Sequence, residues 1–476
     1  MRPLVWFRAD LRVEDNTALY HATRRATRGV VGVFIIARKQ WKDHDWADIK
    51  VEFLRRNLLE LDDRLNTLNI PLVILEEDWF KTAPESLMDL ARKHECDALY
   101  FNREYEVNET RRDDAVQSKF EEGGLEVHAF TDQVVVPPGS LRTNEGKFYT
   151  VFTPFKKSWI ARLEDDGRPV SHGKPKKQAS KVTASDTIPD EIVGFKRRAH
   201  QYDDSIWPPG ESAAKRRLSA FVREPIDDYS DQRDLPGDDG TSRLSAYLTL
   251  GVISPRQCLE AAIEANNGSI NGRKTSASVW ISELIWREFY RHVLVGFPRV
   301  SMHRAFNKST ESIDWRDSES DFEKWVNGET GYPIIDAGMR QLDSEGWVHN
   351  RVRMIVAMFL TKDLLIDWRK GERHFMQRLI DGDLASNNGG WQWSASTGTD
   401  AAPYFRIFNP LSQSKKYDSE GDYIRRHVPE LREAPTELLH DLDRWSDDDR
   451  KRFDYPKPMV DHASGRDRAI EAFKAR

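Results

Sequence analysis

The sequence predicts an α/β Rossmann-like domain with a parallel sheet, followed by an all-α domain. The first part of the chain alternates short apolar runs with amphipathic helical patterns, as parallel sheets covered by helices do. After Trp207 the patterns are helical, without strand alternation. The 476 residues exceed what one hydrophobic core normally holds, so two or three domains are expected.

The α/β domain is expected to span residues 1–131, with five strands. The strand candidates are Leu4–Phe7, Val30–Ile36, Pro71–Leu75, Ala98–Asn102 and Leu125–Phe130. The clearest helix between them is Lys50–Leu68, whose apolar residues recur at helical spacing. A GxGxxG sequence is absent, so the usual NAD-binding interpretation has no support.

Residues 132–206 are expected to form a linker, because positions 164–203 are rich in Pro, Gly, Ser and charge and indicate a long surface connection. The helical domain is expected over residues 207–476. Its predicted helices are Glu211–Phe221, Ser254–Asn266, Ala277–Gly296, Ile335–Leu342, Val348–Ile366 and Glu372–Leu379.

Composition excludes several classes of protein. A net charge of −6 argues against a wholly basic nucleic-acid coat but leaves room for a local basic groove. Cys96 and Cys258 are the only cysteines, so neither a disulfide framework nor a metal site is expected. Such a protein is expected in a reducing cytoplasm. The N-terminus lacks a signal peptide, and no run approaches a transmembrane span. We expect a cytoplasmic monomer without membrane contact.

The segment Ile380–Pro410 is the most unusual part of the sequence. It combines three acids, an Asn pair, a Gly pair and two Trp separated by one residue, and no apolar face at helical or strand spacing explains it. Buried polar groups must be hydrogen-bonded, so this many among aromatics indicate a flat ligand with polar edges. A solvated Gly/Ser/Asn loop is the alternative.

Three other places carry candidate chemistry. Residues 240–245 place Thr and Ser at a helix start, where they either cap the helix or help to bind phosphate. Trp280, Glu283 and Trp286 are spaced three apart, so one helix side presents a carboxylate between two indoles. Asn350 and Met354 share a helix face, suited to hydrogen-bond and contact a base, although a solvated Asn and a core Met are equally consistent.

These segments resemble one protein family. The shared motifs are WxxELIWREFYRH, TGYPIIDAGMRQL, WVHNRVRM and IDGDLASNNGGWQW followed by TGTDAAPYFRIFNP. They resemble the photolyase/cryptochrome family, most closely its class I cyclobutane pyrimidine dimer (CPD) DNA photolyases, and the likeness covers nearly the whole chain. It implies an α/β antenna domain, a linker and a helical domain that binds flavin adenine dinucleotide (FAD).

The resemblance implies a set of FAD-binding residues. The matching positions are Tyr229, Thr241, Ser242, Arg243, Leu244, Ser245, Trp280, Arg287, Arg353, Asp381, Asp383 and Asn387. Within this set we expect Arg353 to pair with Asp381. We expect Asn387 to face the flavin N5, where its amide can accept a hydrogen bond from N5–H.

The resemblance also implies a DNA site and an electron path. The pocket for a flipped-out dimer matches Glu283, Trp286, Asn350, Met354 and Trp393. Candidate phosphate contacts are Arg233, Arg351 and Arg406. The tryptophan chain that photoreduces flavin matches Trp315, Trp368 and Trp391, whereas Trp325 and Trp347 are expected in the core.

The implied function is light-dependent repair of cyclobutane pyrimidine dimers in DNA, with an electron supplied by photoexcited reduced FAD. Glu283, shielded by the indoles of Trp280 and Trp286, is expected to hydrogen-bond a thymine carbonyl. A cryptochrome blue-light photoreceptor and a (6-4) photolyase are the alternatives. The (6-4) enzymes use pocket histidines, and here Asn350 and Met354 stand in those positions.

A second chromophore is expected in the α/β domain. His44, Asn108 and Glu109 match residues that hold methenyltetrahydrofolate in folate-using members of the family. A basic position that those members carry is Met302 in this chain, which removes one expected contact. An 8-hydroxy-5-deazaflavin antenna and an unused site are the alternatives.

Overall fold

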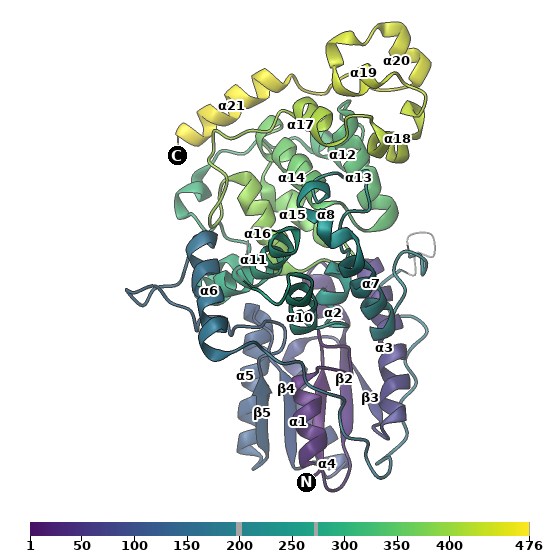
Figure 1. Cartoon of the computed structure of the whole chain (residues 1–476), viewed down its shortest axis with the longest axis vertical. Coiled ribbons are helices and arrows are strands. Elements are labelled where there is room, and N and C mark those ends of the chain that lie inside the picture. The colour runs from purple at the N-terminus through teal and green to yellow at the C-terminus, as the bar shows by residue number, and fades with distance from the viewer. Residues whose placement is uncertain (197–201, 271–274, 476) are drawn as a thin grey trace.

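The computed structural model describes residues 1–196, 202–270 and 275–475. Positions 197–201 of the expected linker, and 271–274 and 476 of the expected helical domain, lie outside the described residues. An α/β domain forms one end of the molecule and helices form the rest (Figure 1). Within the described ranges, no helix is both long and apolar enough to cross a lipid bilayer, and no three His, Cys, Asp or Glu side chains are grouped to hold a metal ion.

The α/β domain is built on a five-stranded parallel sheet in the order β3-β2-β1-β4-β5. The strands are β1 (Pro3–Phe7), β2 (Val31–Ala37), β3 (Leu72–Glu77), β4 (Ala98–Asn102) and β5 (Glu126–Phe130). All five predicted strands are confirmed, within two residues at each end. They were recognisable because a parallel sheet covered on both faces needs nearly continuous apolar strands, and every residue of β1 and β4 is buried.

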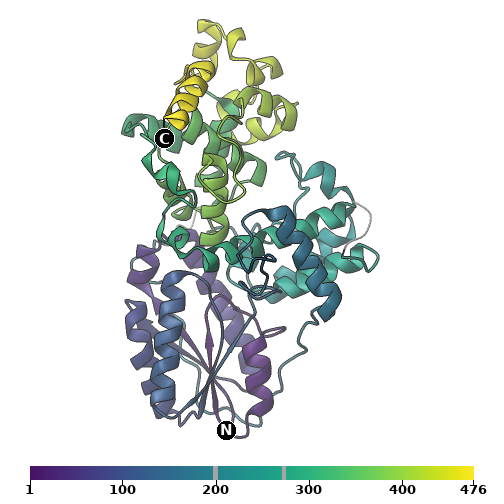
Figure 2. The ribbon, with the colours of Figure 1, turned by 90° about the vertical axis from the view of Figure 1, so that its left-hand side faces the viewer.

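Helices lie on both sides of this sheet (Figure 2). They are α1 (Thr17–Arg25), α2 (Arg38–Asp43), α3 (Asp48–Thr67), α4 (Ala83–Lys93) and α5 (Val107–Glu122), with a 3₁₀ turn at Phe80–Thr82. The predicted helix Lys50–Leu68 is α3. The apolar residues that predicted it, Phe53, Leu54, Leu58, Leu61 and Leu65, are all buried.

The expected linker contains a helix that was not predicted, α6 (Phe152–Asp166). α6 packs on α11 (Ser276–Gly296), and the Trp159 indole donates to Glu288 Oε2 at 2.7 Å. Beyond α6, residues 167–196 form no helix or strand. This connection runs along β3, where the Asp186 N–H donates to the Leu72 carbonyl at 2.9 Å, and so it covers an open edge of the sheet.

The remainder of the chain is helical. Its helices are α7 (Glu211–Arg223), α8 (Pro225–Gln232), α9 (Ser245–Thr249), α10 (Pro255–Ala265), α11, α12 (Glu319–Asn327), α13 (Pro333–Glu345), α14 (Asn350–Met358), α15 (Trp368–Met376), α16 (Leu384–Ala395), α17 (Pro410–Tyr417), α18 (Asp422–His427), α19 (Thr436–His440), α20 (Asp447–Phe453) and α21 (His462–Lys474). Short 3₁₀ turns lie at Pro298–Met302, Lys308–Ser312, Pro429–Leu431 and Leu442–Arg444. The helix predicted over Val348–Ile366 is shorter, because α14 ends in a π-helical turn at Phe359–Asp363.

Helix α16 lies inside the unusual segment Ile380–Pro410. It has no apolar stripe because α11, α14 and α15 pack around it, so most of its circumference is covered. Asp383 caps its first turn by accepting a hydrogen bond from the Ser386 N–H at 3.1 Å. A Cβ at Gly389 would collide with the Tyr290 ring of α11, so this close helix contact requires glycine.

A buried ion network joins the α/β and helical parts. Arg256 of α10 pairs with Asp132 at 2.7 Å and with Asp15 at 3.0 Å, and Arg12 pairs with Asp132. Arg12 also donates to the Gly251 carbonyl at 3.0 Å. Burial alone would raise the pKa of Asp132, but the two guanidinium groups hold it well below its ordinary value. This network fixes the α/β domain against the helical domain.

Candidate functional site

The expected FAD-binding residues come from five segments that pack together. α8 packs on α11, while α11 and α14 both pack on α16. The Arg287 guanidinium donates to the Leu248 carbonyl of α9 at 3.2 Å, and Thr249 donates to the Asp381 carbonyl at 3.3 Å. The fold therefore gathers segments that lie more than 100 positions apart in the sequence.

The segment before α9 is suited to hold a phosphate. The hydroxyl groups of Thr241, Ser242 and Ser245 make no hydrogen bond to any residue that the structure describes, and all three residues are partly exposed. Arg243 has a positive φ of 46°, and its guanidinium lies 4.8 Å from the centre of the Trp347 ring. Hydroxyl donors beside a guanidinium are what an anionic phosphate group needs.

Arg353 and Asp381 form the expected ion pair. The Arg353 Nη2 lies 2.9 and 3.1 Å from the two carboxylate oxygens of Asp381, and its Nε donates to the Val348 carbonyl at 2.8 Å. Asp383 is placed differently, because its carboxylate pairs with Arg291 at 2.8 Å and lines the cavity described below. Burial opposes ionisation of Asp383, yet the charge of Arg291 keeps its pKa below the ordinary value.

The amide of Asn387 has a defined orientation. Its Nδ2 donates to the Glu372 carbonyl at 3.0 Å and to the Glu372 carboxylate at 3.2 Å. Both partners are acceptors, so the nitrogen must face Glu372 and the amide oxygen must face the other way. Asn387 therefore presents a hydrogen-bond acceptor, as expected for a partner of flavin N5–H.

Glu283 lies between Trp280 and Trp286 along α11, and each of the three side chains has a further partner. Trp286 stacks face to face on Phe152 of α6, with ring centroids 3.7 Å apart, and Trp280 packs on Phe221 at 4.9 Å. The Glu283 carboxylate pairs with Arg233 at 2.7 Å. Phe152 of α6 covers one face of Trp286 and Phe221 of α7 makes a tilted contact with Trp280, and the spacing along α11 alone does not reveal these contacts or the Arg233 partner.

The other expected DNA residues differ in their surroundings. Asn350 and Met354 share a face of α14 as predicted, with Nδ2 3.9 Å from the Met354 sulfur. Arg351 pairs with Asp234 at 2.7 Å, so its charge is already offset. Arg406 is exposed, and its side chain makes no ion pair within the described part of the chain. Trp393 is partly buried.

The outer tryptophan of the expected electron path is partly exposed and the other two are buried. Trp315 is partly exposed, whereas Trp368 is 0% and Trp391 3% exposed. Trp368 begins α15, and Trp391 of α16 packs directly against that helix. Trp325 is confirmed as core, being fully buried with its indole donating to the Val356 carbonyl, and Trp347 is buried in the core as well.

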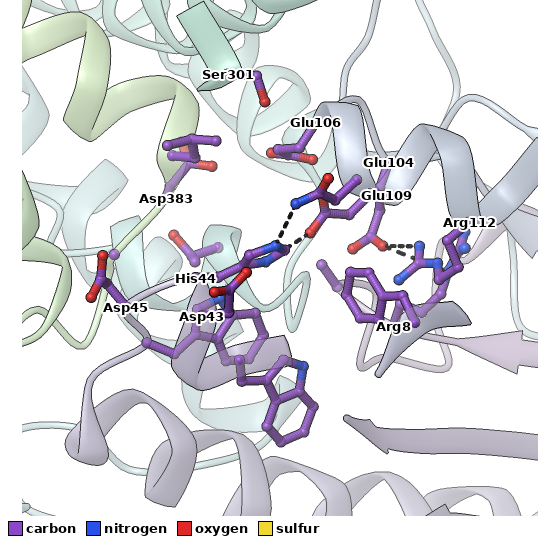
Figure 3. Close-up of a pocket in the computed structure, with 18 of the residues that line it drawn as sticks. Arg8, Asp43, His44, Asp45, Glu104, Glu106, Glu109, Arg112, Ser301 and Asp383 are labelled. Atoms are coloured by element: carbon purple, nitrogen blue, oxygen red, sulfur yellow. Dashed lines mark hydrogen bonds and ion pairs between the residues drawn. The ribbon is translucent and has the colours of Figure 1, made fainter. Parts of the chain in front are cut away.

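The expected antenna residues line a cavity of about 400 Å³ between the α/β domain and the helical domain (Figure 3). The imidazole Nδ1 of His44 lies 3.3 Å from Glu109 Oε1, and its Nε2 lies 3.0 Å from Asn108 Nδ2. Aromatic side chains of Trp6, Phe34, Trp41, Trp46 and Phe80 form much of the wall. Met302 is also in the wall, so the basic contact expected there is absent from that position.

His44 is oriented by its neighbours. Asn108 Nδ2 and Gln40 Nε2 both approach the imidazole Nε2, at 3.0 and 2.9 Å, so in the neutral ring that nitrogen accepts and Nδ1 donates to Glu109. Burial lowers the pKa of His44, but the hydrogen bond and charge of Glu109 outweigh it and raise that pKa above the ordinary value. The contact with His44 thus fixes the orientation of the Glu109 carboxylate, which is positioned to accept a hydrogen bond from a ligand.

Sequence reasoning missed several charged residues of this cavity, among them Glu106, Lys50 and Arg291. The Lys50 ammonium donates to the Gly382 carbonyl at 2.7 Å, and burial lowers its pKa to about 8. Glu106 could have been found, because it stands three positions before Glu109, and the structure shows it as the N-cap residue of α5.

Comparison with known proteins adds independent findings. The family models that match are the "FAD binding domain of DNA photolyase", over residues 280–475, and "DNA photolyase", over residues 3–176. The deoxyribodipyrimidine photo-lyase of Salmonella typhimurium is 43% identical over 472 residues, covering 99% of this chain and 98% of that protein.

Two solved structures are similar over the full chain. A class III photolyase from Agrobacterium tumefaciens has a TM-score of 0.88 at 36% identity, covering 100% of this chain and 97% of the other. An archaeal photolyase from Sulfolobus tokodaii, solved with two FAD molecules, has a TM-score of 0.81 at 30% identity, covering 100% of both chains.

Proposed function

The chain belongs to the DNA photolyase family, and we propose that it repairs cyclobutane pyrimidine dimers in DNA with the energy of absorbed light. The observation that carries the proposal is full-length similarity to deoxyribodipyrimidine photo-lyases, joined to the packing of α8, α11, α14 and α16, which bear the candidate flavin and DNA residues. We further propose that it acts as a monomer in the cytoplasm, associated with the nucleoid when bound to DNA.

The helical part carries an FAD-binding domain. Thr241, Ser242 and Ser245 suit the phosphate groups, since their hydroxyls have no partner among the described residues. Arg353 holds the Asp381 carboxylate in place, where it suits the ribityl chain and ring system of the cofactor. The amide oxygen of Asn387, which faces away from Glu372, suits the flavin N5–H group. When bound and reduced, FAD would supply the photoexcited electron for cleavage of the cyclobutane ring.

The protein's own residues bind and orient the damaged bases. Trp286, whose other face stacks on Phe152, and Trp393 offer aromatic surface for a flipped-out dimer, and base stacking of this kind contributes about 1–3 kcal/mol per base. Glu283 would hydrogen-bond a thymine once its Arg233 partner turns toward a DNA phosphate. The Arg233–Glu283 ion pair thus holds both side chains in position before DNA binds, and neither charge lacks a partner.

We propose that the cavity between the domains holds methenyltetrahydrofolate as a second chromophore. Six carboxylates, five Lys or Arg side chains and His44 line it. Glu106 has no ion-pair partner among the described residues, so the wall suits a ring that donates hydrogen bonds and carries positive charge. A methenyl pterin is such a ring. 8-Hydroxy-5-deazaflavin ionises to an anion and suits these walls less well, and a second flavin is neutral.

A spectrum and a binding assay test these proposals. The purified protein should show flavin absorption together with a separate near-ultraviolet band, and the released cofactors should be FAD and a folate. Its affinity for a duplex with a single thymine dimer should exceed that for the undamaged duplex of the same sequence by at least about tenfold. Equal affinities would contradict dimer recognition, and absence of released FAD would contradict the cofactor.

A further inference from the structure

Glu106 is a carboxylate of the cavity wall that has no Lys or Arg partner among the described residues. Its Oε2 accepts a hydrogen bond from the Tyr105 N–H at 3.1 Å, and no described residue donates to its Oε1. Figure 3 shows Glu106 near Glu109, with Ser301 and Asp383 around the same space. A carboxylate in a recessed site is stable as an anion only when a positive group or a donor accompanies it.

The other carboxylates of the wall are already offset or solvated. The paired ones are Glu104 with Arg112, Asp383 with Arg291, Asp45 with Arg373, and Glu109 with His44. Asp43 is exposed to solvent. Arg8 and Arg112 are further shared with Asp113, outside the wall, at 2.7 and 2.8 Å. Among the described residues, Glu106 is therefore the recessed wall carboxylate without an ion-pair partner, while Lys50, which donates to the Gly382 carbonyl, is a wall cation without a carboxylate partner.

The protonation of Glu106 responds to this imbalance. Burial, and then the charge of Glu109, raise its pKa from 4.5 to about 7. The charged groups that act on it or are influenced by it are Glu104 and Glu109 of its own segment, His44 after α2, Lys50 of α3, Arg291 of α11 and Asp383 before α16. At neutral pH this carboxyl group exchanges a proton readily.

We propose that Glu106 selects the charge of the ring bound in this cavity, favouring a cationic ring such as a methenyl pterin over neutral or anionic rings. The inference rests on the proposed second-chromophore function. Glu109, held by His44, suits the N–H edge of the ring, while Glu106 provides a negative charge that no ion pair among the described residues offsets. The stacked indoles of Trp41 and Trp46, 4.9 Å apart, add aromatic wall, and the Lys50 ammonium lies 3.7 Å from the centre of the Trp46 ring.

Proton release follows from this role. A cationic ligand binds the ionised form of Glu106, so binding expels the proton that the carboxyl group carries at lower pH. Affinity for a cationic ring should rise with pH through the pKa of Glu106. Lys50, with a pKa of about 8, and His44 also lose positive charge as the pH rises, so the part of the rise that Glu106→Gln removes is the part that belongs to Glu106. A neutral ring should show no such rise, because it gains nothing from ionisation of Glu106.

Equilibrium dialysis of the FAD-loaded protein tests the proposal, with methenyltetrahydrofolate as the cationic probe and tetrahydrofolate as the neutral one. Glu106→Gln keeps the shape and removes the charge. It should weaken binding of the cationic probe roughly ten- to a hundredfold and that of the neutral probe by no more than about threefold. The matched control is Glu122→Gln, at the exposed end of α5, which should bind both probes like the wild type.

The outcomes separate this inference from the proposed antenna function. If the wild type binds folate and Glu106→Gln weakens both probes equally or neither, charge selection is overturned and the antenna function stands. If the wild type binds neither folate, both are overturned. If Glu106→Gln does not fold, Glu106→Ala decides by the same comparison: a loss of affinity for the cationic probe alone supports the role, and an equal loss or no loss for both probes overturns it.

Discussion

Replacement of Gly371 by Ala tests the contact that places Trp391 against α15. A Cβ at this position would lie 2.5 Å from Trp391 Cζ3 and 2.6 Å from Leu360 Cδ2, well inside van der Waals contact. Trp391 is 3% exposed and is held on its other sides by Phe375 and Trp325, with ring centroids 5.2 and 6.0 Å away. The indole therefore has no space into which it can retreat.

Two opposing terms set the size of the effect. Alanine in a helix interior gains about 1 kcal/mol over glycine. Overpacking of a filled core costs about 1–3 kcal/mol and sometimes more, and here two side chains must move. We expect Gly371→Ala to lower the free energy of unfolding by about 1–2 kcal/mol, measured by urea unfolding with FAD present. The displaced Trp391 should also slow photoreduction of oxidised FAD.

Gly390→Ala is the matched control, since Gly390 lies on α16 in an exposed position and a Cβ there meets no atom within 4 Å. It should leave stability unchanged or raise it by up to about 1 kcal/mol. A Gly371→Ala protein as stable as the control, with unchanged photoreduction, would refute the packing of Trp391 on α15.

Three further predictions concern the proposed site. Trp368→Phe should block photoreduction of oxidised FAD yet leave repair by chemically reduced enzyme nearly intact, and equal loss of both rates would remove Trp368 from the electron path. Glu283→Ala should keep FAD and most of the affinity for dimer DNA, because the partly exposed ion pair with Arg233 contributes at most about 1 kcal/mol. The number of dimers repaired per absorbed photon should nevertheless fall severalfold. An unchanged yield at saturating DNA would leave Glu283 with a positioning role only. Arg406→Ala should reduce the slope of log affinity against log salt by about 1, and Arg351→Ala by less because Asp234 already offsets its charge; equal slopes for both variants would contradict the counterion argument.

The strands and long helices were predictable because their signals are local. β1 and β4 are buried along their whole length, so their apolar runs stand out in the sequence. The residues that α3 buries recur at helical spacing, so they also stand out in the sequence. α6 carries a similar signal in Phe152, Phe155 and Trp159, but the polar composition of the surrounding linker obscured it.

Helix α16 and the partners of the site residues could not be predicted from local sequence patterns. α16 is covered by three other helices, so its sequence shows no apolar stripe, and only the Asp383 cap with Ser386 three positions later marks its start. Arg233 and Glu283 stand 50 positions apart, and Trp286 meets Phe152 from another segment. Such pairings depend on how helices dock, which residue spacing does not encode. The Arg353–Asp381 pair was anticipated only through the family resemblance.

The most direct test of the central claim is repair of a defined lesion by the FAD-loaded, reduced protein under blue or near-ultraviolet light. Three oligonucleotides are compared in light and in darkness: one with a cyclobutane thymine dimer, one with a (6-4) photoproduct, and one undamaged. The account predicts that only the cyclobutane dimer is converted to two intact thymines, and only in the light. Conversion in darkness, conversion of the (6-4) photoproduct, or no conversion of the cyclobutane dimer under any illumination would contradict it.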